Sequence, residues 1–379
     1  MPSNDRQGTT GPMGPPARTH RPHPSENVLS EYGLVLFMSA SQRLVALAVL
    51  AMLASTGCLD LFGGTTGHHS RSEWAYEMTE IVAMNEEGFT GSGVIVGIVD
   101  TGFDAGHESL KGADLIAWRD FIYDREEPYD DNGHGSHVAG IIAGSGDIVG
   151  AAPDAQLVVA KALDDKGKGS DSVVADAIDW VVDQGAHVIC LSLGGRSGLL
   201  SLGSETRQSC NRALNRGVFI VAAAGNDGEH DDGDVATPAD IDKVIAVGAV
   251  DENLRIAKFS SMGDNDGESP LIPPPLDTDR QDPDKKPEVV APGVDILSAW
   301  KDGDYAKASG TSQATAFVAA IVALELEAHP GYKLKDRNTI DQFKRALQRS
   351  AQPCPGQETP HDDHYGYGLI QALQLHREL

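Results

Sequence analysis

Short aliphatic runs alternate with stretches of helical pattern from about residue 74 to the end of the chain. The runs are continuously apolar, which is typical of strands buried on both faces of a parallel sheet. They predict strands at residues 94–99, 156–162, 187–193, 218–224, 244–250 and 288–290. The stretches between them predict helices at residues 134–143, 171–184, 204–216 and 311–327. This order indicates a doubly wound α/β fold of three layers, with helices on both faces of a mostly parallel sheet.

The first 73 residues lack this pattern. Residues 1–37 carry Pro, Gly and His without an amphipathic period, so we expect either a disordered extension or a start assigned upstream of the true one. Residues 59–73 are rich in Gly, Thr, His and Ser and are typical of a linker. We therefore expect one folded domain at residues 74–379.

Residues 38–58 have the features of a secretory signal. Arg43 supplies a positive charge, residues 44–53 are apolar, and small residues precede Cys58. The apolar run is too short to span a bilayer. A cysteine after Thr-Gly also resembles a lipoprotein signal, in which a lipid is attached to the thiol after cleavage, whereas a buried N-terminal helix is the alternative interpretation. We expect an exported protein that is extracellular or held at the outer face of the cell membrane by a lipid on Cys58.

The chain is strongly acidic. It has 30 Lys and Arg against 56 Asp and Glu, a formal net charge of −26. This balance excludes nucleic acid as a partner, because a nucleic-acid binder needs a basic surface to neutralise phosphates. An acidic surface with few lysines is typical of adaptation to concentrated salt, where the repulsion between carboxylates is screened. The alternative is an acidic surface that only maintains solubility in an ordinary medium.

Two segments place an acid and a histidine where chemistry is expected. Asp100 ends the first predicted strand and is followed by Thr-Gly, and sites in open parallel sheets lie beyond such strand ends. His134 begins a predicted helix of small residues, with His137 one turn later. The acid alone is also typical of a helix cap. The two histidines with Asp131 would suit zinc, whereas a general base and a structural hydrogen-bonding partner are the favoured interpretation.

Two further segments supply a hydroxyl and an amide. Ser312 lies in the sequence Ser-Gly-Thr-Ser at the start of an Ala-rich helix, where free N–H groups and the positive end of the helix dipole gather. Asn226 follows the predicted strand 218–224 and can donate to an oxyanion, together with the backbone N–H of Ser312. Each segment alone suits a helix cap or a turn. Together with Asp100 and His134, they predict a nucleophile, a base and a carboxylate that orients the base.

The four segments in this order resemble the subtilisin-like serine peptidases (subtilases), over about residues 74–375. The matching stretches are VIVGIVDTGFD, NGHGSHVAG, LSLGG, VAAAGNDG, ATPA, KPEVVAPG, SGTSQATA and GYGLIQA. The resemblance implies a catalytic triad and an oxyanion donor formed by Asp100, His134, Ser312 and Asn226. It also implies that His137 is the second, non-catalytic histidine of the family.

The resemblance further implies that a protein or peptide substrate binds as an added extended strand. The implied substrate-binding residues are Leu191, Ser192, Leu193, Gly194, Ala224 and Gly225. Small residues there favour a large apolar side chain at the P1 position, while Asp227 at the rim favours a basic one. We expect a monomer that needs no cofactor for its chemistry. Structural calcium is compatible with the acidic surface, but Ser109 replaces a calcium-ligating Asp of many subtilisins, so that particular site is expected to be weakened.

Three hypotheses for the function follow. The first is an exported serine endopeptidase that acts through an acyl-enzyme. The second is an exported pseudo-enzyme that binds peptides without cleaving them, which the complete set of catalytic residues disfavours. The third is a zinc hydrolase that uses His134 and His137, but Gly135 stands where the HExxH motif has its Glu.

Overall fold

The computed structural model describes residues 72–194, 204–228, 233–266 and 279–379. The predicted extension, the predicted signal with Cys58 and nearly all of the predicted linker lie outside the described residues. Within the described ranges, no helix is both long enough and apolar enough to cross a membrane.

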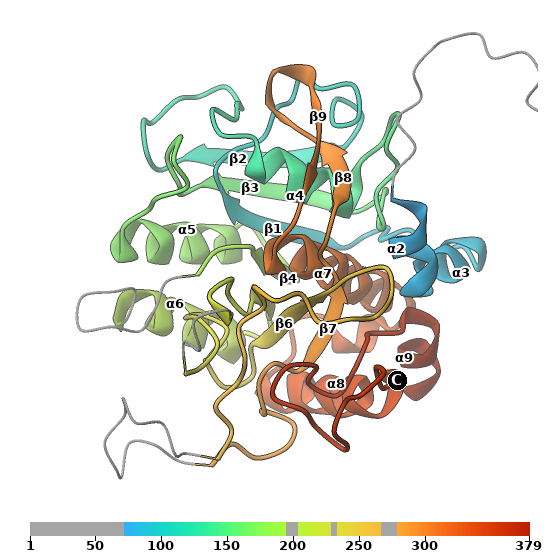
Figure 1. Ribbon diagram of the computed structural model, residues 1–379. Helices are drawn as coiled ribbons and strands as arrows, with labels where there is room; N and C mark the ends of the chain where they lie inside the picture. The colour runs from blue at the N-terminus through green and yellow to red at the C-terminus, as the bar shows by residue number, and fades with distance from the viewer. Residues whose placement is uncertain (1–71, 195–203, 229–232, 267–278) are drawn as a thin grey trace, which may run out of the picture. The chain divides into compact units, whose positions relative to one another are not determined.

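A seven-stranded sheet forms the centre of the domain (Figure 1), with the strand order β2-β3-β1-β4-β5-β6-β7. Each pair of neighbouring strands is parallel. The strands are β1 (Ile95–Asp100), β2 (Asp114–Asp120), β3 (Gln156–Lys161), β4 (Val188–Leu191), β5 (Phe219–Ala223), β6 (Ile245–Val250) and β7 (Val289–Pro292). The chain leaves β1 toward β2 and β3 on one side and continues to β4 on the other. The end of β1 is therefore a switch point of the kind that binds ligands in open α/β sheets.

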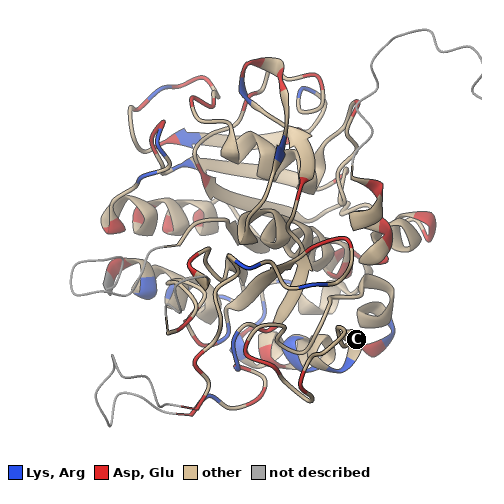
Figure 2. Ribbon diagram, in the orientation of Figure 1, with Lys and Arg blue, Asp and Glu red and all other residues tan. Residues whose placement is uncertain are grey.

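The central strands are apolar because both faces of the sheet are covered. Every residue of β4, β5 and β6 is buried and none is charged. In Figure 2 the acidic and basic residues lie mainly on the loops and outer helices around the sheet. Helices α4 (His134–Ala143) and α7 (Thr311–Ala328) pack on each other, while α5 (Asp171–Asp183) packs against α6 (Ser204–Asn215). Residues 311–326 of α7 are all buried. Its apolar sequence thus reflects a position in the core.

Shorter and more polar elements complete the domain. A two-stranded antiparallel sheet pairs β8 (Ile296–Ala299) with β9 (Tyr305–Ala308) and contacts α4. The other elements are α2 (Glu73–Met78), α3 (Ile81–Glu86), η3 (Lys301–Gly303), η4 (Pro330–Tyr332), α8 (Arg337–Ser350) and α9 (Ala372–Glu378).

The predicted architecture is confirmed, with differences at the sheet edge and in the connections. The six predicted strands and four predicted helices all form. The strand predicted at 187–193 is shorter in the structure, where β4 ends at Leu191. The residues that follow, Ser192 and Leu193, line a cleft instead. The sequence pattern did not predict β2, the β8–β9 pair or the helices α2, α3, α8 and α9.

Candidate active site

Asp100 and His134 meet at the switch point of the sheet. The carboxylate of Asp100 is fully buried, and its Oδ1 lies 2.8 Å from His134 Nδ1 and accepts a hydrogen bond of 2.6 Å from Thr101 N. His134 is the first residue of α4, after Gly133 at φ 108°. A Cβ on Gly133 would lie 2.4 Å from the Trp300 ring, so glycine is required where the chain turns to present the histidine.

The environment of His134 leaves its Nε2 available to accept a proton. Because Asp100 Oδ1 is an acceptor, Nδ1 carries the proton, and Nε2 of the neutral ring is then an acceptor. The side chain is 26% exposed and lines the cleft. Burial alone would lower the pKa of His134, but the charge and the hydrogen bond of Asp100 raise this pKa above its ordinary value.

Ser312 lies in the first turn of α7, on the same cleft as His134. Its Oγ donates a hydrogen bond of 3.0 Å to the carbonyl oxygen of Ser192, and Ser192 Oγ donates one of 3.1 Å to the carbonyl oxygen of Ser312. The two residues therefore hold each other through a reciprocal pair of bonds. In this structure the Ser312 hydroxyl is bonded to Ser192 and not to His134.

Asn226 is oriented by the start of α7. Its Oδ1 accepts hydrogen bonds from Thr311 N at 3.0 Å and from Thr311 Oγ1 at 3.1 Å. A backbone N–H can only donate, so the amide oxygen must face Thr311 and the amide nitrogen is left to donate elsewhere. Asn226 and Ser312 both line the cleft. First-turn N–H groups have no acceptor within their own helix, so Ser312 N is a second donor there.

The cleft has a volume of about 920 Å³. Four of the six expected substrate-binding residues line it: Ser192, Leu193, Gly194 and Gly225. Leu191 and Ala224 are instead fully buried and are not part of its lining, because Leu191 ends β4 and Ala224 directly follows β5. Ala236 and Asp227 also line it. Gly225 has φ +116°, and a Cβ there would lie 2.6 Å from Ser261 Oγ, so this wall accepts only glycine.

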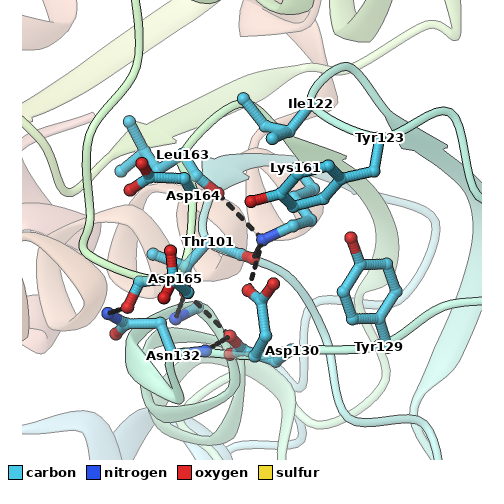
Figure 3. Close-up of polar contacts among 12 residues, drawn as sticks. Thr101, Ile122, Tyr123, Tyr129, Asp130, Asn132, Lys161, Leu163, Asp164 and Asp165 are labelled. Carbon is cyan, nitrogen blue, oxygen red and sulfur yellow. Dashed lines mark hydrogen bonds and ion pairs between the residues drawn. The ribbon is translucent and has the colours of Figure 1, made fainter.

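Asp130 and Thr101 brace the segment before His134, and sequence reasoning missed both roles. Asp130 Oδ1 accepts bonds from Thr101 Oγ1, Asn132 N and Gly133 N at 2.8–3.0 Å. Its Oδ2 accepts from the backbone and hydroxyl of Ser136 at 2.9 and 2.8 Å. Figure 3 shows Asp130 and Asn132 beside Thr101. One buried carboxylate thus connects the end of β1 to the first turn of α4. The Asp-Asp-Asn-Gly run before His134 is the only signal of this role in the sequence.

Lys161 was also missed. It ends β3, in register with Asp100 of β1, and is fully buried. Its Nζ donates to the carbonyl oxygens of Thr101 and Leu163 at 2.5 and 2.9 Å and to Asp131 Oδ1 at 2.7 Å. Figure 3 shows the ammonium group of Lys161 between Thr101 and Leu163. All three protons of the ammonium group are used, so Lys161 links the segments that follow β1 and β3, next to Asp100.

The contacts of His137 and Asp131 do not support the zinc alternative. His137 Nε2 lies 3.0 Å and 3.1 Å from the carbonyl oxygens of Ile296 and Ala306, and Nδ1 lies 3.4 Å from Gln313 Nε2. Burial and the charge of His134 lower the pKa of His137 to about 4, which keeps the ring neutral. Asp131 accepts a bond from Lys161. His134, His137 and Asp131 therefore each contact different partners. His137 is a structural link between α4 and the β8–β9 pair.

Ser109 does not fit a calcium ligand. It is fully buried, its Oγ accepts a bond of 2.9 Å from Ile148 N, and this oxygen lies 2.9 Å from Tyr305 Oη. A hard cation prefers charged oxygen ligands, and this hydroxyl already has protein partners. The residue therefore connects the loop at Ile148 to strand β9.

Comparisons with known proteins identify the family of the chain. A model of the Subtilase family matches residues 91–368. The chain is 36% identical to Subtilisin Savinase of Lederbergia lenta over 303 residues, which are 79% of this chain and 96% of that protein. It is 36% identical to Subtilisin DY of Bacillus licheniformis over 248 residues, 64% of this chain and 80% of that protein. It is 33% identical to a thermostable alkaline protease of Halalkalibacterium halodurans over 302 residues, 79% and 72% of the two chains. The chain therefore belongs to the subtilase family and is a subtilisin-type serine endopeptidase.

Proposed function

We propose that this endopeptidase cleaves peptide bonds through an acyl-enzyme formed on Ser312. The observation that carries the proposal is the 2.8 Å contact of Asp100 with His134, on a cleft that Ser312 also lines. His134 Nε2 takes the hydroxyl proton as Ser312 Oγ attacks the scissile carbonyl, and later gives it to the leaving amine. Asp100 holds the ring in the required tautomer and stabilises the imidazolium.

Ser312 must first change its hydrogen-bond partner. Its hydroxyl donates to the Ser192 carbonyl oxygen, and attack requires donation to His134 instead. A backbone N–H of an extended substrate would compete for the same carbonyl oxygen. Substrate binding would thereby release the hydroxyl toward the base. This exchange ties peptide recognition along residues 192–194 to activation of the nucleophile.

Asn226 and the start of α7 would stabilise the oxyanion. The fixed amide orientation of Asn226 leaves Nδ2 as a donor, and Ser312 N supplies the second. Both donors are in place before reaction, so little reorganisation is needed as negative charge develops. The small residues of the cleft support a preference for a large apolar side chain at P1.

We propose an exported monomer, extracellular or attached through a lipid on Cys58, with a surface adapted to concentrated salt. Its charge of −26 supports the salt adaptation. Measuring activity and thermal midpoint across NaCl concentrations tests this point. Both should rise toward molar salt, whereas indifference to salt would contradict it.

Labelling with a peptide phosphonate tests the catalytic proposal. A phosphonate reacts with a serine only where a base activates the hydroxyl. Intact mass should show one adduct per chain, peptide mapping should place it on Ser312, and Ser312→Ala should remove both labelling and peptide hydrolysis. A folded wild-type protein that binds peptides but takes up no label would identify the pseudo-enzyme instead. Undiminished hydrolysis by Ser312→Ala would overturn the proposal.

A further inference from the structure

The far end of α7 carries a cluster that the peptidase reaction does not use. Glu325 lies in the last turn of this helix, and His329 is the residue that caps its end. His376 comes from α9, the last helix of the chain, which packs against α7 (Figure 1). None of the three lines the substrate cleft. Three side chains of types that can bind a metal, one carboxylate and two imidazoles, thus meet outside the active site.

Glu325 is buried without a hydrogen-bonding partner. Its side chain is fully buried, and neither carboxylate oxygen makes a hydrogen bond with the described residues. Burial raises the pKa of Glu325 to about 9. By contrast, Glu327 on the same helix accepts bonds of 2.7 Å from Thr90 N and Gly91 N. A buried carboxylate without such donors is costly unless a proton or a cation neutralises it.

The three ligand atoms form a triangle of suitable size for a metal. Glu325 Oε2 lies 3.7 Å from His329 Nε2 and 3.4 Å from His376 Nδ1. The two histidine nitrogens are 3.1 Å apart. In a tetrahedral zinc site, bonds of about 2.0–2.2 Å place neighbouring ligand atoms about 3.3–3.6 Å apart. The triangle therefore matches one face of such a tetrahedron after shifts of a few tenths of an ångström.

The donor set selects the type of metal. Two imidazoles with one carboxylate suit zinc, whereas calcium and magnesium prefer sites made of oxygen. The side chains of His329 and His376 are 25% and 24% exposed, so an ion can enter and a water can take the fourth position. The ring of Phe89 packs against that of His376, with 5.1 Å between the ring centroids.

We propose that Glu325, His329 and His376 bind one Zn²⁺, which joins α9 to the end of α7. The ion neutralises the buried carboxylate and cross-links two helices that are separated by more than forty residues of chain. Its role is structural, because the cluster lies outside the cleft. This proposal does not depend on the catalytic roles of Asp100, His134 and Ser312.

Zinc binding by the exported protein tests the proposal. The Ser312→Ala background prevents self-digestion, the protein carries no polyhistidine tag, and calcium is kept in the buffer so that any calcium sites stay filled. After removal of zinc by a chelator, titration with Zn²⁺ should show one more equivalent bound than in the His376→Ala or Glu325→Gln variants. His364→Ala is the matched control, since this exposed histidine lies outside the cluster, and it should bind as much zinc as the parent.

Thermal unfolding supplies the second readout. Zinc at about one hundred times its Kd should raise the midpoint of the parent by roughly 5 °C and leave that of Glu325→Gln unchanged. Glu325→Gln keeps the shape of the side chain, so it serves if His376→Ala fails to fold. Equal zinc binding by the parent and Glu325→Gln, or no zinc-dependent shift in the parent, would overturn the proposal and leave a protonated Glu325 beside a hydrogen-bonded histidine pair.

Discussion

The two ends of α7 differ in how their buried polar side chains are hydrogen-bonded. At the N-terminal end, Thr311 and Ser312 have partners in Asn226 and Ser192. At the C-terminal end, the Glu325 carboxylate is buried without a hydrogen bond. The N-terminal contacts hold the oxyanion donors and the Ser312 side chain at the cleft before substrate binds. The buried Glu325 carboxylate at the C-terminal end instead requires a proton or a cation to neutralise it. A cation bound there would stabilise the fold.

Outside the triad itself, loss of the oxyanion donor should give the largest effect. We expect Asn226→Leu to lower kcat by about 10²–10³ with little change in KM, the magnitude established for the equivalent donor of subtilisin. Thr311→Val is the matched control, because it removes one contact to Asn226 but keeps the backbone donor that orients the amide. Steady-state kinetics should show a loss of no more than about tenfold for Thr311→Val. Equal losses in the two variants would contradict the assignment.

Loss of the Lys161 contacts should have the next largest effect, in this case on the stability of the fold. Lys161→Met leaves two strand-end carbonyls and Asp131 without their donor, and we expect it to lower the free energy of unfolding by about 3 kcal/mol. Denaturant unfolding in the Ser312→Ala background measures the effect. Lys166→Met, on the exposed loop, should change stability by less than about 0.5 kcal/mol. A Lys161 effect of that small size would show that the contact does not support the fold.

The pH profile should report the partner of His134. The base must be neutral to accept a proton, so a raised pKa moves the acid limb of kcat/KM to higher pH than an unperturbed histidine would give. In Asp100→Asn the charge that raises the pKa is gone, and the limb should move to lower pH while activity falls. An acid limb in the same place in both proteins would contradict the role of Asp100.

The rim of the cleft should give the smallest effect. Asp227 lines the cleft, and its charge is expected to favour a basic P1 side chain by up to about fivefold, as is usual for exposed ion pairs. Asp227→Ser should lower the ratio of kcat/KM for Arg against Phe substrates. An unchanged ratio would leave the small residues of the walls as the main source of specificity.

Much of this fold could be predicted because its signals are local. The continuous apolar runs predicted six central strands, and β4, β5 and β6 are indeed fully buried. The edge strand β2 was missed because its sequence, DLIAWRD, mixes charged and apolar residues on partly exposed positions. Helix α8 was missed although Ile340, Phe343 and Leu347 repeat at helical spacing on its buried face.

Sequence reasoning could predict a site residue where a polar side chain directly ends an apolar strand, as Asp100 ends β1. Lys161 could not be predicted, since nothing in a strand sequence says that a terminal lysine turns inward to cap carbonyls of the neighbouring strand. That role depends on the register of β3 against β1. Glu325 and His329 are visible as an i, i+4 pair, but the packing of α9 alone brings His376 to them.

Non-additivity of mutations tests the central claim most directly. If Asp100, His134 and Ser312 act as one unit, the Asp100→Ala/His134→Ala/Ser312→Ala variant should hydrolyse peptides no more slowly than Ser312→Ala alone, with both about 10⁶-fold below wild type in kcat, as found for the triad of subtilisin. A triple variant whose loss equals the product of three separate losses would contradict the account, because the residues would then act independently.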